Sequence, residues 1–143
     1  MKQDFLETEI SIALVKETFS TELSRQLSLA RISSPIAILD GTGINDDLNG
    51  CERPVAFPLK AMQDRRAVVV HSLAKWKRIR LKQMGIEPGN GILTDMRALR
   101  PDEEFTAIHS IYVDQWDWEQ RIKPEERSLL KLKQTVTKIY DAH

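Results

Sequence analysis

The chain has 143 residues, enough for one compact domain with a hydrophobic core, and its 21 basic residues balance 21 acidic ones. A net charge of zero gives no global attraction to nucleic acid or to a membrane surface, and no apolar run approaches the length of a membrane span. The N-terminus lacks an apolar signal-like segment, and a single cysteine cannot form an internal disulfide. These features predict a single domain, residues 1–143, in the cytoplasm, with no nucleic-acid or membrane partner.

The first third of the chain predicts a long helix followed by an edge strand. Apolar residues at helical spacing run through 8–27 and predict one buried helix face. They are Ile12, Val15, Phe19, Leu23 and Leu27. A strand is expected at 31–39, but Pro35 cannot donate a backbone hydrogen bond, so this strand should lie at a sheet edge or a bulge. An open edge could pair with a second copy of the chain, and an edge covered within the monomer fits the same pattern.

Residues 40–54 form a loop dense in glycine, asparagine and aspartate. The loop is weakly similar to a calcium-binding loop, but Ile44 and Asn45 stand where an oxygen ligand and a glycine are required, which rejects that motif. The histidines show no metal-ligand spacing with the cysteine, so we assign no metal ligand to the chain. The loop either presents Asp46 or Asp47 to an ammonium group or is a solvated connector.

The middle of the chain predicts a hairpin and a basic helix. Strands are expected at 54–60 and 67–71, and a helix should begin at Ser72 and stop at Gly85. Lys75 and Lys77 fall in the first turns, where the helix dipole disfavours a cation by about 0.3–1 kcal/mol. One explanation is a solvated cationic face; the other is that these lysines meet a carboxylate or a phosphate.

Residues 91–119 predict two strands joined by a charged loop. In the second strand, side chains alternate between two faces. One face carries the aromatic residues Tyr112, Trp116 and Trp118, which have the bulk to bury against helices. The other face carries Gln115 and Asp117, which either form the floor of a polar site or lie on the wet face of the sheet. Arg100 ends the first strand, where it either clamps a phosphate or belongs to a solvated loop.

The last segment predicts a helix from Pro124 to His143 with one apolar stripe. The stripe consists of Leu129, Leu132, Val136 and Ile139. No stop signal precedes the final residue, which favours a truncated chain. The order helix, strand, loop, hairpin, helix, hairpin, helix predicts an α+β fold with an antiparallel or mixed sheet flanked by helices.

Four segments resemble ammonia-dependent asparagine synthetase, the aspartate–ammonia ligase of bacteria. They are DLNG at 47–50, HSLAKWKR at 71–78, ALRPDE at 98–103 and HSIYVDQWDWE at 109–119. The resemblance covers essentially the whole chain, but family members are more than twice as long. It therefore implies the N-terminal part of a catalytic domain similar to that of class II aminoacyl-tRNA synthetases, incomplete at its C-terminal side.

The resemblance also implies an activity and its residues. The family converts L-aspartate, ammonia and ATP to L-asparagine, AMP and diphosphate through a β-aspartyl-adenylate. Residues matched to L-aspartate binding are Asp46, Ser72, Lys77, Gln115 and Asp117. Arg100 matches the catalytic arginine that holds the α-phosphate of ATP. Mg²⁺ should accompany ATP, with its ligands beyond residue 143. The first helix and the Pro35 strand match the element that forms a cytoplasmic homodimer.

Two other functions remain open. A shortened relative could be catalytically inactive and act as an aspartate-binding or dimerisation module. A relative that charges tRNA is the third hypothesis, and the zero net charge and the lack of an anticodon-binding appendage argue against it. No glutaminase-like nucleophile is visible, so free ammonia is the expected nitrogen donor.

Overall fold

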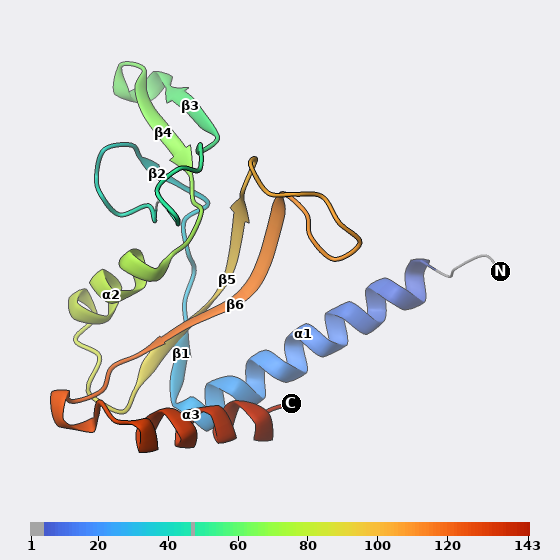
Figure 1. The fold of residues 1–143 in the computed structure, drawn as a ribbon, viewed down its shortest axis with the longest axis vertical. Coiled ribbons are helices and arrows are strands. Elements are labelled where there is room, and N and C mark those ends of the chain that lie inside the picture. Colours follow the sequence, from blue (N-terminus) through green and yellow to red (C-terminus); the bar gives the residue numbers. More distant parts are fainter. Residues whose placement is uncertain (1–4, 47) are drawn as a thin grey trace. The chain divides into compact units, whose positions relative to one another are not determined.

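The computed structural model describes residues 5–46 and 48–143 (Figure 1). The chain divides into two compact units. Unit 1 contains the described residues up to Ala30, together with Glu87–Gly91 and Gln120–His143, and unit 2 contains Arg31–Ile86 and Ile92–Glu119. The boundaries at 30/31, 91/92 and 119/120 fall inside strands, so the backbone of three strands is shared between the units. That residues 1–143 behave as a single domain stays a prediction.

Unit 1 contains the helices α1 (Phe5–Leu27) and α3 (Leu129–Asp141), which contact each other. The predicted apolar face of α1 is confirmed at its C-terminal end, where Leu23 and Leu27 are each 1% exposed. Towards its N-terminus the prediction is wrong, because Ile12 and Val15 are 47% and 56% exposed. None of the helices in the described ranges combines the length and the apolar character needed to cross a membrane.

The start of α3 differs from the prediction. Pro124–Glu126 form a separate 3₁₀ turn, and the helix begins at Leu129. Ser128 is the better N-cap, because its hydroxyl accepts a hydrogen bond from the Lys131 N–H at 3.2 Å. The predicted apolar stripe also faces mostly outward: three of its four residues are more than half exposed. They are Leu129 (66%), Leu132 (59%) and Val136 (56%).

The first sheet has the order β1 (Leu29–Arg31), β5 (Gly91–Leu99), β6 (Tyr112–Gln120). β5 and β6 form an antiparallel hairpin, in which the Arg100 N–H donates to the Ile111 carbonyl at 2.8 Å. The bonds from Gly91 to Ser28 and from Ile32 to Leu93 advance in the same direction on β1 and β5, as in a parallel pair. The mixed sheet predicted from the sequence is therefore confirmed.

The second sheet has the order β2 (Ala37–Leu39), β4 (Arg65–Val69), β3 (Ala56–Leu59), with antiparallel pairing throughout. The expected single strand at 31–39 is instead two strands, β1 and β2, that belong to different sheets. The interruption contains Pro35, which has no N–H to give to a ladder. Both strands lie at the edge of their described sheets, as the proline predicts.

The core of unit 2 joins the segment directly after β4, the helix α2 (Ala74–Gln83) and β5. Its central residues are Val70, Leu73, Trp76, Met96 and Ala98, all at most 7% exposed. This core fixes α2 against β5, because each element contributes apolar side chains that are removed from water only when both are in place. The helix that carries Lys77 and the strand that leads into Arg100 are thereby held in a defined relation.

The ends of α2 follow from local chemistry. The helix begins at Ala74, two residues after the predicted start, and its N-cap is Leu73 and not Ser72. The Ser72 hydroxyl still accepts a hydrogen bond from the Ala74 N–H at 3.2 Å. At the other end, Gly85 has φ +62° and the Ile86 N–H bonds to the Leu81 carbonyl at 3.1 Å. This is the Schellman motif, and it confirms the predicted stop at Gly85.

Candidate functional site

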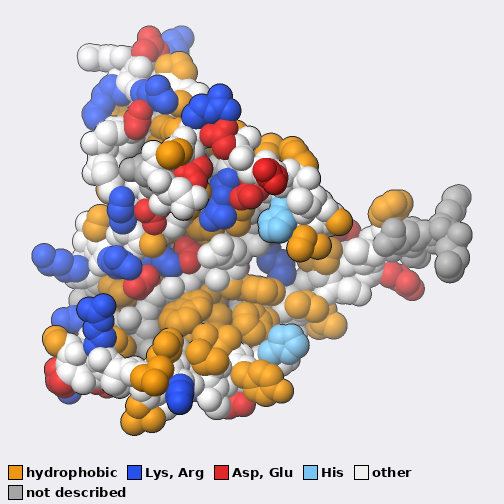
Figure 2. Space-filling model, viewed as in Figure 1, with side chains coloured by type: hydrophobic (Ala, Val, Ile, Leu, Met, Phe, Trp, Pro, Cys, Tyr) orange, Lys and Arg blue, Asp and Glu red, His pale blue; other side chains and the backbone are white. Residues whose placement is uncertain are grey.

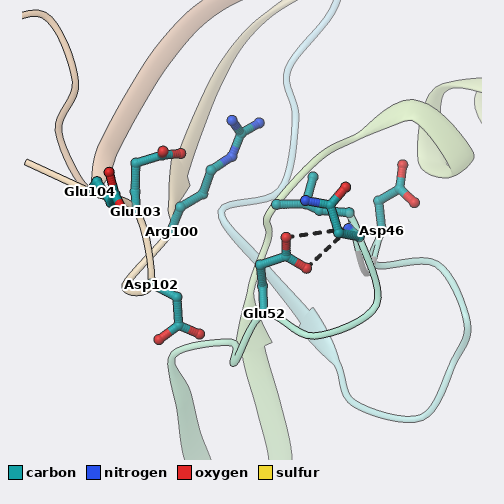
Figure 3. Close-up of a pocket in the computed structure, with 8 residues that line it drawn as sticks. Asp46, Glu52, Arg100, Asp102, Glu103 and Glu104 are labelled. Carbon is teal, nitrogen blue, oxygen red and sulfur yellow. Dashed lines mark hydrogen bonds between the residues drawn. The ribbon is translucent and has the colours of Figure 1, made fainter.

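Asp46 and Arg100 line one open cavity of about 590 Å³ in unit 2 (Figure 3). Arg100 follows the end of β5, and Asp46 lies on the loop after β2, so the two side chains reach the cavity from different segments. The lining residues are Asp46, Leu48, Asn49, Glu52, Arg100, Asp102, Glu103 and Glu104. Arg100 is the single cation among these eight residues, which gives an anionic group one defined position in the cavity.

Arg100 is half-buried and already oriented. Its Nε and Nη2 atoms donate to the backbone carbonyl of His71 at 3.4 and 3.3 Å. A guanidinium has five N–H donors, so this carbonyl uses two of them and the rest of the fork can serve an anion. The His71 N–H in turn donates to the Asn45 side chain at 2.9 Å. His71 therefore connects Arg100 with the residue that precedes Asp46.

The cations at the start of α2 meet carboxylates of the same chain. Lys75 Nζ lies 3.8 Å from Asp46 Oδ1 and donates to the Asn45 carbonyl at 3.4 Å. The structure thus places an ammonium group beside Asp46. Asp47, the other carboxylate that the sequence offers to an ammonium group, lies outside the described residues.

Lys77, Gln115 and Asp117 form a second cluster in unit 2. Lys77 is 4% exposed, and its ammonium donates to Asp117 Oδ1 and, at 2.9 Å, to the Trp118 carbonyl. Asp117 is 7% exposed, and Gln115 Nε2 approaches its Oδ1 at 3.5 Å. The burial of Asp117 excludes the interpretation that it lies on a wet sheet face, whereas Gln115 is exposed.

The aromatic face of β6 is less buried than the sequence predicts. Trp116 and Trp118 are half-buried, and Tyr112 is 48% exposed. The expected burial of this whole face against helices is therefore wrong within the described residues. The alternation itself is correct, but it identifies the two faces of a strand and not which of them is covered.

The six residues predicted from the sequence thus fall into separate groups. Asp46 and Arg100 share the cavity, Lys77, Gln115 and Asp117 share the buried cluster, and Ser72 lies just before α2, where its hydroxyl accepts from the Ala74 N–H. Their roles stay predictions. Among the described residues, no three His, Cys, Asp or Glu side chains are arranged to hold a metal ion.

Arg53 and Asp102 were not among the site residues predicted from the sequence. The Arg53 side chain hydrogen-bonds the carboxylate of Asp102, which lies in the lining of the cavity. This bond, together with the one from the Arg53 N–H, holds the pKa of the Asp102 carboxyl below its usual range. The two residues are 49 positions apart in the sequence, and no local pattern indicates that they meet.

Comparison with known proteins identifies the family. The aspartate–ammonia ligase family profile matches residues 6–143. The chain belongs to the aspartate–ammonia ligase family. An aspartate–ammonia ligase of Bacteroides thetaiotaomicron is 55% identical over 139 residues, which cover 97% of this chain and 40% of the relative. One of Clostridium perfringens is 53% identical over 134 residues, 94% of this chain and 40% of the relative.

This member of the aspartate–ammonia ligase family spans about 40% of the length of these curated relatives. Solved structures with the same fold include Desulfitobacterium hafniense PylSc, a pyrrolysyl-tRNA synthetase, with a TM-score of 0.64 and 17% identity. The match covers 92% of this chain and 44% of that chain. It confirms the aminoacyl-tRNA synthetase-like α+β fold predicted from the sequence and shows that this chain corresponds to part of such a domain.

Proposed function

We propose that this chain supplies the aspartate-binding and phosphate-binding part of an aspartate–ammonia ligase. In the proposed reaction, a side-chain carboxylate oxygen of L-aspartate attacks the α-phosphorus of ATP and diphosphate leaves. Ammonia then attacks the acyl carbon of the β-aspartyl-adenylate, and AMP leaves with the transferred oxygen. Membership of the family supports this reaction class, and the shorter length of the chain makes it a proposal for the chain itself.

The observation that carries the proposal is the shared cavity of Asp46 and Arg100. Adenylate formation needs a cation where negative charge builds up on the α-phosphate, and a carboxylate that receives the α-ammonium group of aspartate. Arg100 and Asp46 have these two properties and reach the cavity from separate segments (Figure 3). Lys75 beside Asp46 supports this role, because it makes the type of ammonium–carboxylate contact that we assign to the substrate.

We assign Lys77, Gln115 and Asp117 to the carboxylate side of the substrate, with Ser72 at its rim. Support comes from the buried ammonium of Lys77, which Asp117 and the Trp118 carbonyl hold in one position. A buried and fixed cation loses little further entropy on binding an anion and acts in a low-dielectric setting. Gln115, exposed beside this pair, is accessible to a substrate.

For ATP, the planar guanidinium of Arg100 fits one phosphate group. We propose no nucleic-acid partner for the chain. We propose that any Mg²⁺ bound with ATP takes its ligands from residues that correspond to the remaining part of the relatives.

The test is L-aspartate-dependent exchange of diphosphate into ATP. We expect exchange by the chain and a loss of about 10²–10³-fold in Arg100→Ala, because a donor aimed at developing charge contributes that much. Arg97→Ala is the matched control, since Arg97 is exposed on β5, the strand that precedes Arg100, and does not line the cavity. Absence of exchange, or equal loss in both variants, would contradict adenylation by this chain.

A second candidate is an inactive aspartate-binding module. The observation that favours it is the charge of the cavity. Among the described lining residues, five carboxylates accompany the one cation Arg100, so a triphosphate would be poorly compensated. Calorimetric titration separates the two functions. The ligase predicts binding of both L-aspartate and ATP, with ATP binding weakened in Arg100→Ala, whereas the inactive module predicts binding of aspartate alone.

We further propose a homodimer, located in the cytoplasm, that uses the first helix and the Pro35 segment. Support comes from the exposed apolar residues of α1, which include Leu6 at 68% and Leu14 at 66%, and from the edge positions of β1 and β2. Exposed apolar surface of this kind favours association. Sedimentation analysis should show a dimer that dissociates in Leu6→Glu/Leu14→Glu, and a monomeric parent chain would contradict the proposal.

A further inference from the structure

An ion pair connects the two segments that carry the cavity residues. Arg53 closes the loop that contains Asp46, and Asp102 lies in the turn that follows Arg100. The Arg53 N–H donates to Asp102 Oδ2 at 2.7 Å. Its Nε lies 3.0 Å from Oδ1 and 3.3 Å from Oδ2, and its Nη2 donates to Oδ1. The carboxylate therefore fixes both the backbone and the side chain of Arg53.

We propose that Arg53 and Asp102 are a positioning pair that keeps the loop of Asp46 next to the turn of Arg100. The inference rests on the proposed function, because it assigns to the pair the task of holding the aspartate-side and ATP-side residues on one cavity. Asp102 itself lines that cavity, whereas Arg53 does not, so Arg53 acts through the loop and not through the substrate.

The exposure of the pair defines what it can do. The Arg53 side chain is 83% exposed and that of Asp102 is 25% exposed. Exposed ion pairs contribute little to global stability, typically about 0–1 kcal/mol. A contact with a backbone N–H and a two-pronged guanidinium still restricts the local loop conformation, because three donors must be released together before the loop moves. The pair should therefore alter loop order far more than global unfolding.

The same loop offers a matched control at its other end. Arg66 Nε lies 2.9 Å from Asp40 Oδ2, and the two side chains are 60% and 43% exposed. Neither residue lines the cavity. An effect of surface ion pairs in general would appear in Arg66→Ala as well, whereas a positioning effect would be confined to Arg53 and Asp102.

The experiment is amide hydrogen exchange over residues 45–53 of the full chain, followed by mass spectrometry. We expect Asp102→Ala to accelerate exchange in this segment by about tenfold or more, since local opening controls exchange. Arg53→Ala should have a smaller effect, because its backbone N–H still meets Asp102. Arg66→Ala should leave the segment unchanged. Equal protection in Asp102→Ala and the parent chain, or equal loss in Arg66→Ala, would overturn the proposal.

A kinetic measurement then relates loop order to substrate binding. In the diphosphate exchange assay, Arg53→Ala should raise the KM for L-aspartate about tenfold with a smaller effect on kcat, because correct positioning is lost rather than a reacting group. Arg53→Lys, which keeps one charged donor, should recover most of this change. A fall in kcat with KM unchanged would overturn the assigned role.

Hydrogen exchange and diphosphate exchange test the two proposals separately. If the parent chain shows no diphosphate exchange, the proposed ligase function of this chain is wrong, while hydrogen exchange still decides whether the pair holds the loop. If hydrogen exchange shows no effect but diphosphate exchange is robust, the ligase proposal stands and the positioning pair is rejected. Circular dichroism melting of each variant verifies that a change in the loop is not global unfolding.

Discussion

At the scale of single residues, the buried pair of Lys77 and Asp117 has the clearest energetic consequence. Both side chains are at least nine-tenths buried, and each charge has the other as a partner. Removing two charges from water is costly, and their mutual attraction with a hydrogen bond to the Trp118 carbonyl offsets that cost. The pair is therefore sensitive to loss of one member, because the remaining buried charge loses its closest partner; for Lys77, only the Glu119 carboxylate at 3.8 Å would remain.

We expect Asp117→Ala to lower the free energy of unfolding by about 3–5 kcal/mol, because the buried Lys77 ammonium loses its closest carboxylate and keeps only the more distant Glu119. The double variant Asp117→Leu/Lys77→Met should recover most of the loss, since it removes both charges. Urea denaturation measures these values. Asp95→Ala is the control: its ion pair with Arg31 at 3.7 Å is about half exposed and should change stability by less than about 1 kcal/mol. Equal losses in both single variants would contradict this account.

At the scale of secondary-structure elements, α3 is unusual because its apolar stripe faces outward. Leu132 and Val136 are more than half exposed, whereas the half-buried positions include Lys131 and Thr135. Figure 2 shows exposed hydrophobic side chains along α1 and α3. Tyr140 at 79% exposure extends the stripe along α3. Because these side chains are exposed, α3 buries little apolar area within the chain. Exposed apolar surface of this kind is typical of an interface.

Because the apolar stripe of α3 is exposed, we expect a glutamate introduced there to affect stability much less than a glutamate introduced at a buried position of α1. Leu132→Glu should change the free energy of unfolding by no more than about 0.5 kcal/mol, because its side chain is already in water. Leu23→Glu, at a position that is 1% exposed, should cost several kcal/mol, on the order of 3 or more, because it buries a carboxylate without a partner. Thermal melting followed by circular dichroism compares the two. A large loss in Leu132→Glu would show that the stripe is buried in solution.

At the scale of the whole molecule, the two compact units raise the question of cooperativity. The boundaries between them fall within β1, β5 and β6, so the backbone of each of these strands continues from one unit into the other. Covalent continuity within a sheet favours joint unfolding. On this ground we propose that the units behave as the single domain predicted for residues 1–143.

We expect a single unfolding transition in urea. All three tryptophans, Trp76, Trp116 and Trp118, belong to unit 2, so their fluorescence reports that unit. Circular dichroism at 222 nm is weighted towards helix, and two of the three α-helices among the described residues, α1 and α3, belong to unit 1. Midpoints that coincide within about 0.2 M would indicate one cooperative domain, whereas separated midpoints would show two that unfold independently.

The sequence alone determined the features that depend on local chemistry and on long matched motifs. Gly85 ends α2 because a glycine adopts positive φ readily, and Pro35 restricts its segment to a sheet edge because it lacks an N–H. The motifs at 71–78 and 109–119 were sufficient to predict the family and the α+β fold. Asp46 and Arg100 were likewise selected from the sequence, although only the folded chain shows that they line one cavity.

The tertiary structure decided which faces are covered and which distant charges meet. Periodicity identifies the residues that share a face of α3 or β6, but burial of that face depends on what packs against it. The Lys77–Asp117 and Arg53–Asp102 contacts join residues 40 and 49 positions apart, and their geometry depends on how α2, β6 and two loops fold together. The local preferences of residues for helix, strand or turn do not indicate which distant side chains will meet. Such contacts are determined only when the chain is packed.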